Sequence, residues 1–367
     1  IVQILLSGGL CNLLCAMLEE VFPLTEDEME FAFTFRGDLD KRRVVAICRQ
    51  GEAAGFDYSW FFDTHVLWRD LYPQMAVAME YTSKLRFGPC VTNPQVREWS
   101  VAASLFGALS VQSDGRFDLG VGRGDSSVRV VGKRPATVVR MERFCETMKG
   151  LVRGDSVTYD NRPEPVSFDW TGRYELPIWV AGYGPKALAS AGRIGNGLIV
   201  QLAEPSLCKW MGDAAKTAGA DAGRDMSNYR VMACAPVWVG DKQKGMAQTK
   251  WFPALVGNHI ADILKWYGSD TKEVPQALTA YVQKREGLGA DEGYDYKQHT
   301  QMDDENSYYV TDDTTEAFCL VGPAEAHVEK LRRLEAAGVT QFNIYLCSGE
   351  EERQIAEYGE HIIPQFR

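Results

Sequence analysis

Two spacings of apolar residues alternate along most of this chain. Short runs that are apolar at nearly every position are followed by longer stretches whose apolar residues recur at helical spacing, such as Val44, Val45, Ile47 and Cys48. A short, nearly continuous apolar run is typical of a parallel strand that is covered on both sides. The two spacings predict strands at residues 31–35, 58–62, 84–92, 116–122, 177–181, 197–201, 229–239 and 341–346, and helices at residues 41–54, 71–81, 95–112, 135–151, 184–194, 205–219 and 323–337.

The alternation of eight strands with helices predicts an α/β fold, specifically a (β/α)8 TIM barrel. A doubly wound sheet is the main alternative, but it would leave several of the strands outside one sheet. A plain barrel needs about 250 residues. We therefore assign the surplus to an atypical leader at residues 1–28, a β-hairpin insertion at about 153–174 and a second insertion at about 250–313, all flanking or interrupting a single barrel domain at residues 29–367.

The leader is apolar but lacks the basic start and the small-residue cleavage site of a signal peptide. Polar residues, Glu19 and Glu20 among them, also interrupt it too often for a spanning helix. We interpret it as a segment of cloning origin or peculiar to this chain, and give it no part in the function.

The second insertion is expected to carry helices around residues 259–267 and 274–285, followed by a polar run at 287–306. Long insertions between barrel elements often serve as lids or subunit contacts. Its aromatic residues indicate an apolar wall for a substrate pocket. They are Trp251, Phe252, Trp266 and Tyr267.

Composition narrows the function classes. The chain has 367 residues and a formal net charge of −11, so nucleic acid and anionic membrane surfaces are not expected partners. Nine cysteines at irregular spacing show neither a disulfide framework nor paired CxxC motifs, which predicts a reducing, cytoplasmic location. No pair among His259, His299, His327 and His361 has the spacing of zinc ligands, so no metal is predicted.

The chemistry of a barrel lies at the carboxyl ends of its strands. Four of these ends are polar or glycine-rich here, and their convergence predicts a binding pocket. The residues are Asp63, His65 and Trp68 after the second strand, Cys90, Val91, Thr92 and Asn93 at the third, Gly122 and Arg123 at the fourth, and Gly182, Tyr183, Gly184, Pro185 and Lys186 after the fifth.

The segment 182–186 opens a helix, so its free N–H groups and the positive end of the helix dipole would face the pocket. With Arg123, this segment forms a candidate phosphate site. The alternative is that Gly184 and Pro185 only form a turn in a loop, and that Lys186 is solvated. The glycine turn at 120–124 is too closely spaced for the dinucleotide-binding fingerprint.

Five segments together resemble the bacterial luciferase-like flavin oxidoreductases. This family includes FMN-dependent monooxygenases and deazaflavin (coenzyme F420) dependent dehydrogenases and reductases. The resemblance covers about residues 31–367. The matching segments are FFDTHVLWRDLYP at 61–73, RFGPCVTNPQVRE at 86–98, GRFDLGVGRGD at 115–125, WVAGYGPKALASAGRIGNGLI at 179–199 and VGPAEAHVEKLRRLEAAGVTQF at 321–342.

The resemblance implies roles for individual residues. A non-prolyl cis peptide is expected between Cys90 and Val91, where it would support the isoalloxazine ring, with Cys90 as a backbone support rather than a nucleophile. Arg123 matches the position that binds the flavin phosphate in luciferases, whereas several deazaflavin enzymes carry a smaller residue there. This match favours FMN slightly over F420 as the cofactor.

The turn after the second strand favours F420 instead, because Asp63, His65 and Trp68 resemble the Asp-His and Trp set of the deazaflavin dehydrogenases. The match is imperfect, since Thr64 separates the first two residues. His65 is the expected catalytic group near the flavin N5, oriented by Asp63. Asp125 lies near an acid–base carboxylate of some deazaflavin enzymes, or only caps the following loop.

We therefore expect an FMN- or F420-dependent monooxygenase or dehydrogenase that acts on a small organic substrate. With FMN, a flavin reductase or NAD(P)H would supply electrons; with F420, only hydride transfer is available. The family usually forms homodimers through helices near strands two and three. The alternatives are a cofactor-free barrel, either a hydrolase or a non-catalytic luciferase-like subunit, and an electron-transfer or flavin-storage protein. No GxSxG or HxH motif supports a hydrolase.

Overall fold

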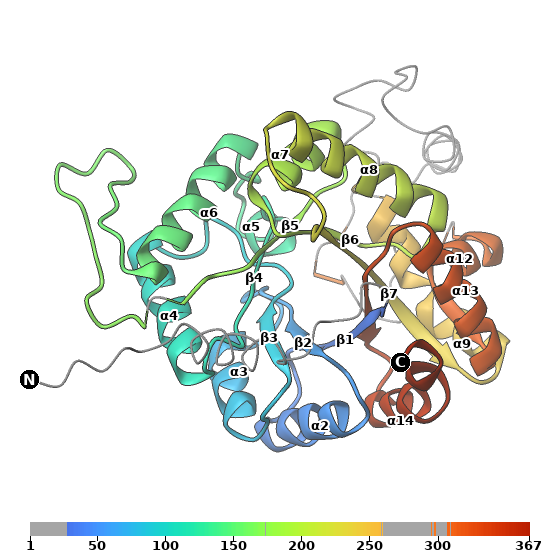
Figure 1. Ribbon diagram of the computed structural model, residues 1–367. Coiled ribbons are helices and arrows are strands. Elements are labelled where there is room, and N and C mark those ends of the chain that lie inside the picture. The colour runs from blue at the N-terminus through green and yellow to red at the C-terminus, as the bar shows by residue number, and fades with distance from the viewer. Residues whose placement is uncertain are drawn as a thin grey trace, which may run out of the picture.

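Eight parallel strands curl into a barrel that a ring of helices surrounds in the computed structural model (Figure 1). The neighbouring strands run in the order β3-β2-β1-β9-β7-β6-β5-β4. The structure describes residues 28–172, 174–257, 259, 295, 297–298, 307–308 and 310–367. The strands are β1 (Glu30–Phe35), β2 (Tyr58–Phe61), β3 (Arg86–Pro89), β4 (Leu119–Val121), β5 (Ile178–Ala181), β6 (Gly197–Val200), β7 (Arg230–Val239), β8 (Leu320–Gly322) and β9 (Gln341–Leu346).

The predicted barrel is thus confirmed, and the seam between β3 and β4 completes it. Parallel bridges join Phe87 to Phe117 and Thr92 to Val121 across this seam. The strands approach so closely that a Cβ atom on Gly120 would collide with the carbonyl oxygen of Pro89, which explains a glycine there. Between the two bridges lies the cis peptide Cys90–Val91, as the resemblance implied.

The helices follow the strands as the spacing predicts, because each strand must be covered on its outer face. Their packing is close: a Cβ atom on Gly51 of α2 would collide with the ring of Phe33 on β1. The helices are α2 (Lys41–Ala53), α3 (Leu71–Glu80), α4 (Trp99–Gln112), α5 (Ser126–Arg129), α6 (Val138–Arg153), α7 (Pro185–Ile194), α8 (Pro205–Asp221), α9 (Lys242–Thr249), α12 (Asp312–Phe318), α13 (Ala324–Ala336) and α14 (Glu351–Glu357).

Some elements differ from expectation. The helix predicted from residue 95 begins only at Trp99, because the Glu98 carboxylate accepts the backbone N–H of Val101 and caps the helix there. The insertion at 153–174 is not a strand hairpin in its described residues; one antiparallel bridge joins Val157 to Val166. The helices expected within 259–285, the polar run and the leader lie largely or wholly outside the described residues.

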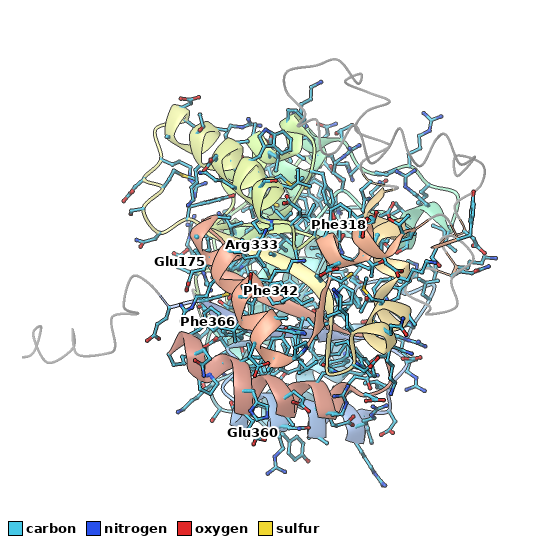
Figure 2. All side chains as sticks on the ribbon, turned by 90° about the vertical axis from the view of Figure 1, so that its right-hand side faces the viewer. Glu175, Phe318, Arg333, Phe342, Glu360 and Phe366 are labelled. Atoms are coloured by element: carbon cyan, nitrogen blue, oxygen red, sulfur yellow. The ribbon has the colours of Figure 1, made fainter. Side chains whose placement is uncertain are left out.

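The C-terminal part of the chain contains the predicted helix α13 and adds α12, β8 and α14, which the spacing did not reveal. The end of β7 runs beyond the barrel and pairs with the short strand β8. Helices α13 and α14 cover that side of the barrel (Figure 2). His327 of α13 ties these elements together: its Nε2 donates to the Trp238 carbonyl at 3.1 Å, so its Nδ1 accepts the Tyr358 hydroxyl at 3.0 Å.

The amino-terminal end of the barrel is closed by buried polar side chains. Asp118 accepts hydrogen bonds from the Tyr58 hydroxyl at 3.1 Å and the Trp179 indole at 2.9 Å, and pairs with Arg86. The guanidinium of Arg230 lies over the Trp179 ring and donates to Tyr58. This cluster fills the barrel floor, so any ligand site must lie at the other end. Nowhere in the described chain is a helix both long and apolar enough to span a bilayer.

Replacing His327 with Gln should remove part of the acid sensitivity of the fold. Burial lowers the pKa of His327 to about 4 from an ordinary value of 6.5. The folded protein therefore binds fewer protons than the unfolded chain between these values, and stability should fall as pH drops from 6.5 towards 4. From pH 7.5 to 4.5 the loss in unfolding free energy from this group should be about 2–3 kcal/mol.

Urea unfolding at both pH values measures this loss. Gln can still donate to the Trp238 carbonyl but does not titrate, so the H327Q protein should lack that part of the decline. An equal decline in both proteins would contradict the assignment.

Candidate active site

A cavity of about 1160 Å³ opens at the carboxyl end of the barrel. Small-molecule pockets commonly enclose about 300–1,000 Å³, so this one has room for a cofactor together with a substrate. Its walls come from the ends of β2, β3, β4, β5, β6 and β9, and from the helical segment that follows α9. The cavity lies at the strand ends where the sequence analysis placed the binding pocket.

Most of the predicted site residues line this cavity. His65 does not: it is exposed, and within the described part of the chain no hydrogen bond or ion pair involves it. Thr92 and Asn93 are buried behind the wall, and Pro185 begins α7. The predicted residues in the wall are Asp63, Trp68, Cys90, Val91, Gly122, Arg123, Gly182, Tyr183, Gly184 and Lys186.

Asp63 is almost fully buried where β2 ends. Its Oδ2 accepts hydrogen bonds from the Thr92 hydroxyl and from Arg97, both at 2.6 Å. Its Oδ1 is buried and has no hydrogen-bond partner in the described structure. Burial raises the pKa of Asp63, and Arg97 and Thr92 oppose that rise. Asp63 is therefore bonded to these two residues rather than to His65.

One wall of the cavity lies between β3 and β4. Cys90 and Val91, on either side of the cis peptide, reach the cavity beside Gly122. A Cβ atom on Gly122 would lie 2.9 Å from Cγ2 of Val91, closer than packed atoms come. A glycine at this position thus leaves the Val91 side chain in place and lets a planar ligand approach the backbone.

Cations gather at the mouth of the cavity, although the chain as a whole is acidic. The Arg123 guanidinium is held by its Nε, which donates to the Ala136 carbonyl at 2.6 Å. Arg134 and Lys186 also line the cavity, and no described carboxylate forms an ion pair with either. The amino end of α7 begins at Pro185 beside them. This mouth suits an anionic group such as a phosphate.

Asp125 does not cap α5 with its side chain. Instead, its Oδ1 pairs with Arg129 at 2.8 Å, and its Oδ2 lies 3.8 Å from Nε2 of His259. The His259 ring stacks on the ring of Tyr183, with 5.1 Å between their centres. All four side chains line the cavity, so Asp125 is a second carboxylate in its wall.

Two tyrosines and a glutamine form a hydrogen-bonded chain across the inner end of the cavity. The Tyr183 hydroxyl donates to Oε1 of Gln201, and Nε2 of Gln201 donates to the Tyr345 hydroxyl, both at 3.0 Å. Below them, the side-chain amide of Asn343 contacts the thiols of Cys90 and Cys234. Burial raises the pKa of both tyrosines well above their usual value, so they act here as neutral hydroxyl groups.

Several wall residues were not predicted. Gln201 and Tyr345 lie at the carboxyl ends of β6 and β9. The rule that barrel chemistry lies at the carboxyl ends of strands would have identified them if it had been applied to every strand. Arg134 follows no strand, and His259 was assigned to the insertion, so neither gave a signal. Among the described residues no cluster of three or more His, Cys, Asp or Glu side chains is placed to hold a metal ion.

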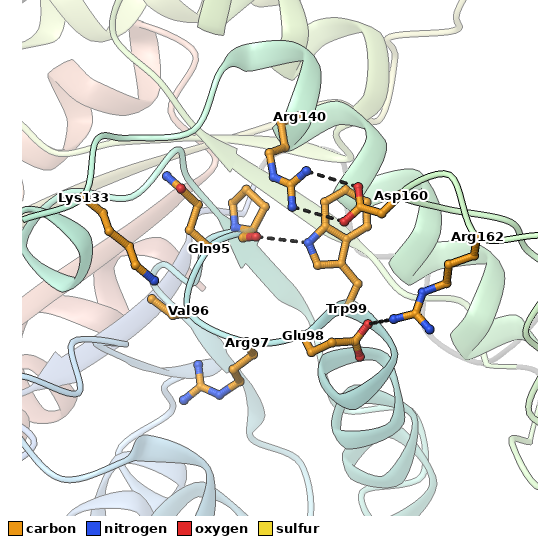
Figure 3. A pocket seen from close by; sticks show the side chains of 10 residues that line it. Gln95, Val96, Arg97, Glu98, Trp99, Lys133, Arg140, Asp160 and Arg162 are labelled. Atoms are coloured by element: carbon orange, nitrogen blue, oxygen red, sulfur yellow. Dashed lines mark hydrogen bonds and ion pairs between the residues drawn. The ribbon is translucent and has the colours of Figure 1, made fainter. Parts of the chain in front are cut away.

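A smaller pocket of about 420 Å³ lies outside the barrel, beside the start of α4 (Figure 3). It is also rich in arginine, but Arg140 pairs with Asp160 and Arg162 pairs with Glu98. Arg140 also stacks on the Trp99 ring. These two arginines already have partners, whereas Lys133, which also lines this pocket, forms no ion pair with a described carboxylate.

The chain matches the family model described as luciferase-like monooxygenase over residues 29–341. It is 25% identical over 355 residues to 5,10-methylenetetrahydromethanopterin reductase of Archaeoglobus fulgidus, covering 92% of this chain and 100% of that protein. It is 30% identical over 231 residues to F420-dependent hydroxymycolic acid dehydrogenase of Mycobacterium tuberculosis, covering 57% of this chain and 62% of that protein.

The fold also matches a solved structure of coenzyme F420 dependent tetrahydromethanopterin reductase from Methanopyrus kandleri. The TM-score is 0.71 at 22% identity, over 93% of this chain and 100% of that one. At this identity the match supports the fold alone, and it agrees with the barrel derived from the strand order.

Replacing Gln201 with Leu should destabilise the inner end of the cavity, because the Tyr183 hydroxyl would lose its buried acceptor. The expected loss in unfolding free energy is about 1–3 kcal/mol. Urea denaturation of the Q201L, Y183F and double variants forms a cycle. Y183F should cost less in the Q201L background than in the wild type; strictly additive losses would contradict the hydrogen-bonded chain.

Proposed function

Because the chain belongs to the luciferase-like monooxygenase family, we propose that it binds coenzyme F420 in the barrel cavity and transfers hydride to or from a small organic substrate. The cavity is the observation that carries this proposal. It combines a wall at the cis peptide of Cys90 and Val91 with cations at its mouth that form no ion pair with a described carboxylate. A planar ring with an anionic tail is the ligand shape that these two features fit.

The slight preference for FMN that we drew from Arg123 is not supported. One relative, which covers 57% of this chain, and one solved structure, which covers 93% of it, carry F420 in their names. F420 carries a longer anionic tail than FMN, and the mouth offers Arg134 and Lys186 in addition to Arg123. When bound, F420 supplies a ring carbon that accepts or donates hydride.

The protein's own residues would hold and shield this ring. Cys90 and Val91 would support one face of it, and Trp68 of the cavity wall would help to exclude water from the other side. Asp63 and His65 were expected as a catalytic pair at the end of β2. We retain Asp63 in the site on its position in the wall; His65 would have to turn inward to reach a ligand.

An FMN-dependent monooxygenase is the second candidate, because the held guanidinium of Arg123 can bind the phosphate of either cofactor. Its Nε bond to Ala136 fixes the guanidinium and leaves the two NH2 groups for a phosphate. In that case a partner reductase or NAD(P)H would have to supply the electrons. A cofactor-free barrel is not supported, because the relatives that match this chain are named as a reductase and a dehydrogenase. The seven described cysteines are all free and buried, consistent with the predicted reducing, cytoplasmic setting.

We further propose that the enzyme is a homodimer joined through α3 and α4, which lie side by side in Figure 1. Exposed apolar side chains lie along both helices: Tyr81 at the end of α3 is 59% exposed and Val101 of α4 is 61% exposed, while Val77 and Val111 are 37% and 40% exposed. Exposed apolar surface can mark an interaction surface. A second copy of the same surface would cover it with twofold symmetry.

Fluorescence titration of the purified protein with F420 and with FMN under anaerobic conditions tests the cofactor. F420 should bind with a micromolar dissociation constant and more tightly than FMN. Replacing Arg134 and Lys186 together with Ala should weaken F420 binding about tenfold, or about 1.4 kcal/mol, and reduce its dependence on salt. R140A is the matched control, because this arginine lies outside the cavity and is paired. Tighter binding of FMN would favour the monooxygenase; binding of neither would refute both.

The V101E substitution should separate the dimer, since it places a charge in the apolar surface of α4. Light scattering after gel filtration should give twice 41.0 kDa for the wild type and 41.0 kDa for the variant. V131E is the control, because Val131 is comparably exposed (46%) but lies outside α3 and α4. A wild-type mass of 41.0 kDa would contradict the proposal.

A further inference from the structure

We infer that the carboxyl group of Asp63 exchanges the proton that accompanies hydride transfer, and that Arg97 positions this carboxyl. The inference rests on the proposed function, because an alcohol that loses hydride must also lose its hydroxyl proton. It gives Asp63 a direct role in place of the indirect one, orienting His65, that the sequence suggested.

The two oxygens of Asp63 are in different surroundings. Oδ2 accepts two short hydrogen bonds, from Thr92 and from Arg97. Oδ1 accepts none from the described residues, although its side chain is only 1% exposed and the residue lines the cavity. A buried carboxylate oxygen without a donor is costly. A proton or a ligand hydroxyl at Oδ1 removes that cost.

Arg97 holds the carboxyl from behind. One of its terminal nitrogens donates to Asp63 at 2.6 Å, and the other donates to Asp70 at 2.7 Å. The guanidinium also stacks on the Tyr72 ring, 4.6 Å from its centre. Asp70 in turn caps α3 by accepting the backbone N–H of Tyr72. The orientation of Asp63 is therefore fixed by a rigid helix start rather than by a loop.

The charges around Asp63 oppose one another. Burial raises its pKa, Arg97 and Thr92 lower it, and Asp70 raises it slightly. A carboxyl in this balance can accept a proton in one direction of a reaction and return it in the other. The raised pKa brings that exchange closer to neutral pH than for an exposed aspartate.

His65 and Asp125 fit the role of the proton-exchanging group less well than Asp63. His65 is exposed and does not reach the cavity wall. The side chain of Asp125 is 25% exposed, and His259 already lies 3.8 Å from its free oxygen. Only Asp63 combines near-complete burial with an oxygen that has no described partner.

The reaction balances with Asp63 as the base. The O–H bond of a secondary alcohol breaks and its proton forms a new O–H bond on Oδ1 of Asp63. The C–H bond breaks with both electrons, which leave as hydride to the oxidised deazaflavin, and a C=O bond forms. The reverse direction reduces a ketone, with Asp63 donating the proton. This step applies to an alcohol or its carbonyl partner as the substrate class.

Labelling with dicyclohexylcarbodiimide tests the inference without a substrate, because this apolar reagent attacks protonated carboxyl groups. The rate of adduct formation at Asp63 is followed by peptide mass spectrometry between pH 5 and 9. R97M removes a cation, so the midpoint of labelling should move to higher pH. D70N removes an anion but keeps a capping side chain, so the midpoint should move to lower pH. R97K should stay close to the wild type.

Opposite shifts in R97M and D70N would support the inference, and loss of fold cannot produce both. No adduct at Asp63 in the wild type, or one midpoint in all variants, would overturn it.

The D63N protein, loaded with F420 and mixed with 2-propanol or cyclohexanol, should reduce F420 at least about 100-fold more slowly than the wild type, with its F420 affinity changed less than threefold.

Equal rates in D63N and wild type would also overturn the inference. Failure of the wild type to bind F420 would refute the proposed function instead, and the labelling would still decide whether Asp63 is the titrating group of the cavity.

Discussion

Parallel hydrogen bonding among eight strands is the constraint on which the rest of this molecule depends. Parallel strands place all their carboxyl ends at one side of the barrel, so residues far apart in sequence, such as Asp63, Gln201 and Tyr345, meet in one cavity. The backbones approach closely at the seam between β3 and β4, and Gly120 allows this seam to close. The same seam carries the Cys90–Val91 cis peptide, whose residues line the cavity.

The two ends of the barrel use buried charge differently. At the floor, Asp118 has two hydrogen-bond donors and an arginine, and the cluster serves stability. At the cavity, Asp63 and Asp125 are each held through one oxygen by an arginine, and the other oxygen of each accepts no hydrogen bond in the described structure. A satisfied network rigidifies a fold, whereas an incompletely satisfied one is available to a ligand. This contrast separates the structural end from the functional end.

Much of the fold could be predicted from the sequence because buried parallel strands and amphipathic helices leave strong periodic signals. Strand β9 and helix α7 lie close to the predicted ranges. Elements without that periodic signal were not predicted: α12 is short and polar, and β8 pairs only with the outer end of β7. In the site, the strand-end rule found Asp63 but could not show that Thr64 is buried while His65 is exposed. That difference is set by the path of one turn, which spacing does not encode.

The most direct test of the account is a crystal structure of the protein with bound F420. We predict that the deazaflavin ring lies against Cys90 and Val91, with its anionic tail among Arg123, Arg134 and Lys186 and its reacting edge towards Asp63. Binding of F420 in the outer pocket beside Trp99 and Arg140, or a ring placed away from the β3–β4 seam, would contradict it.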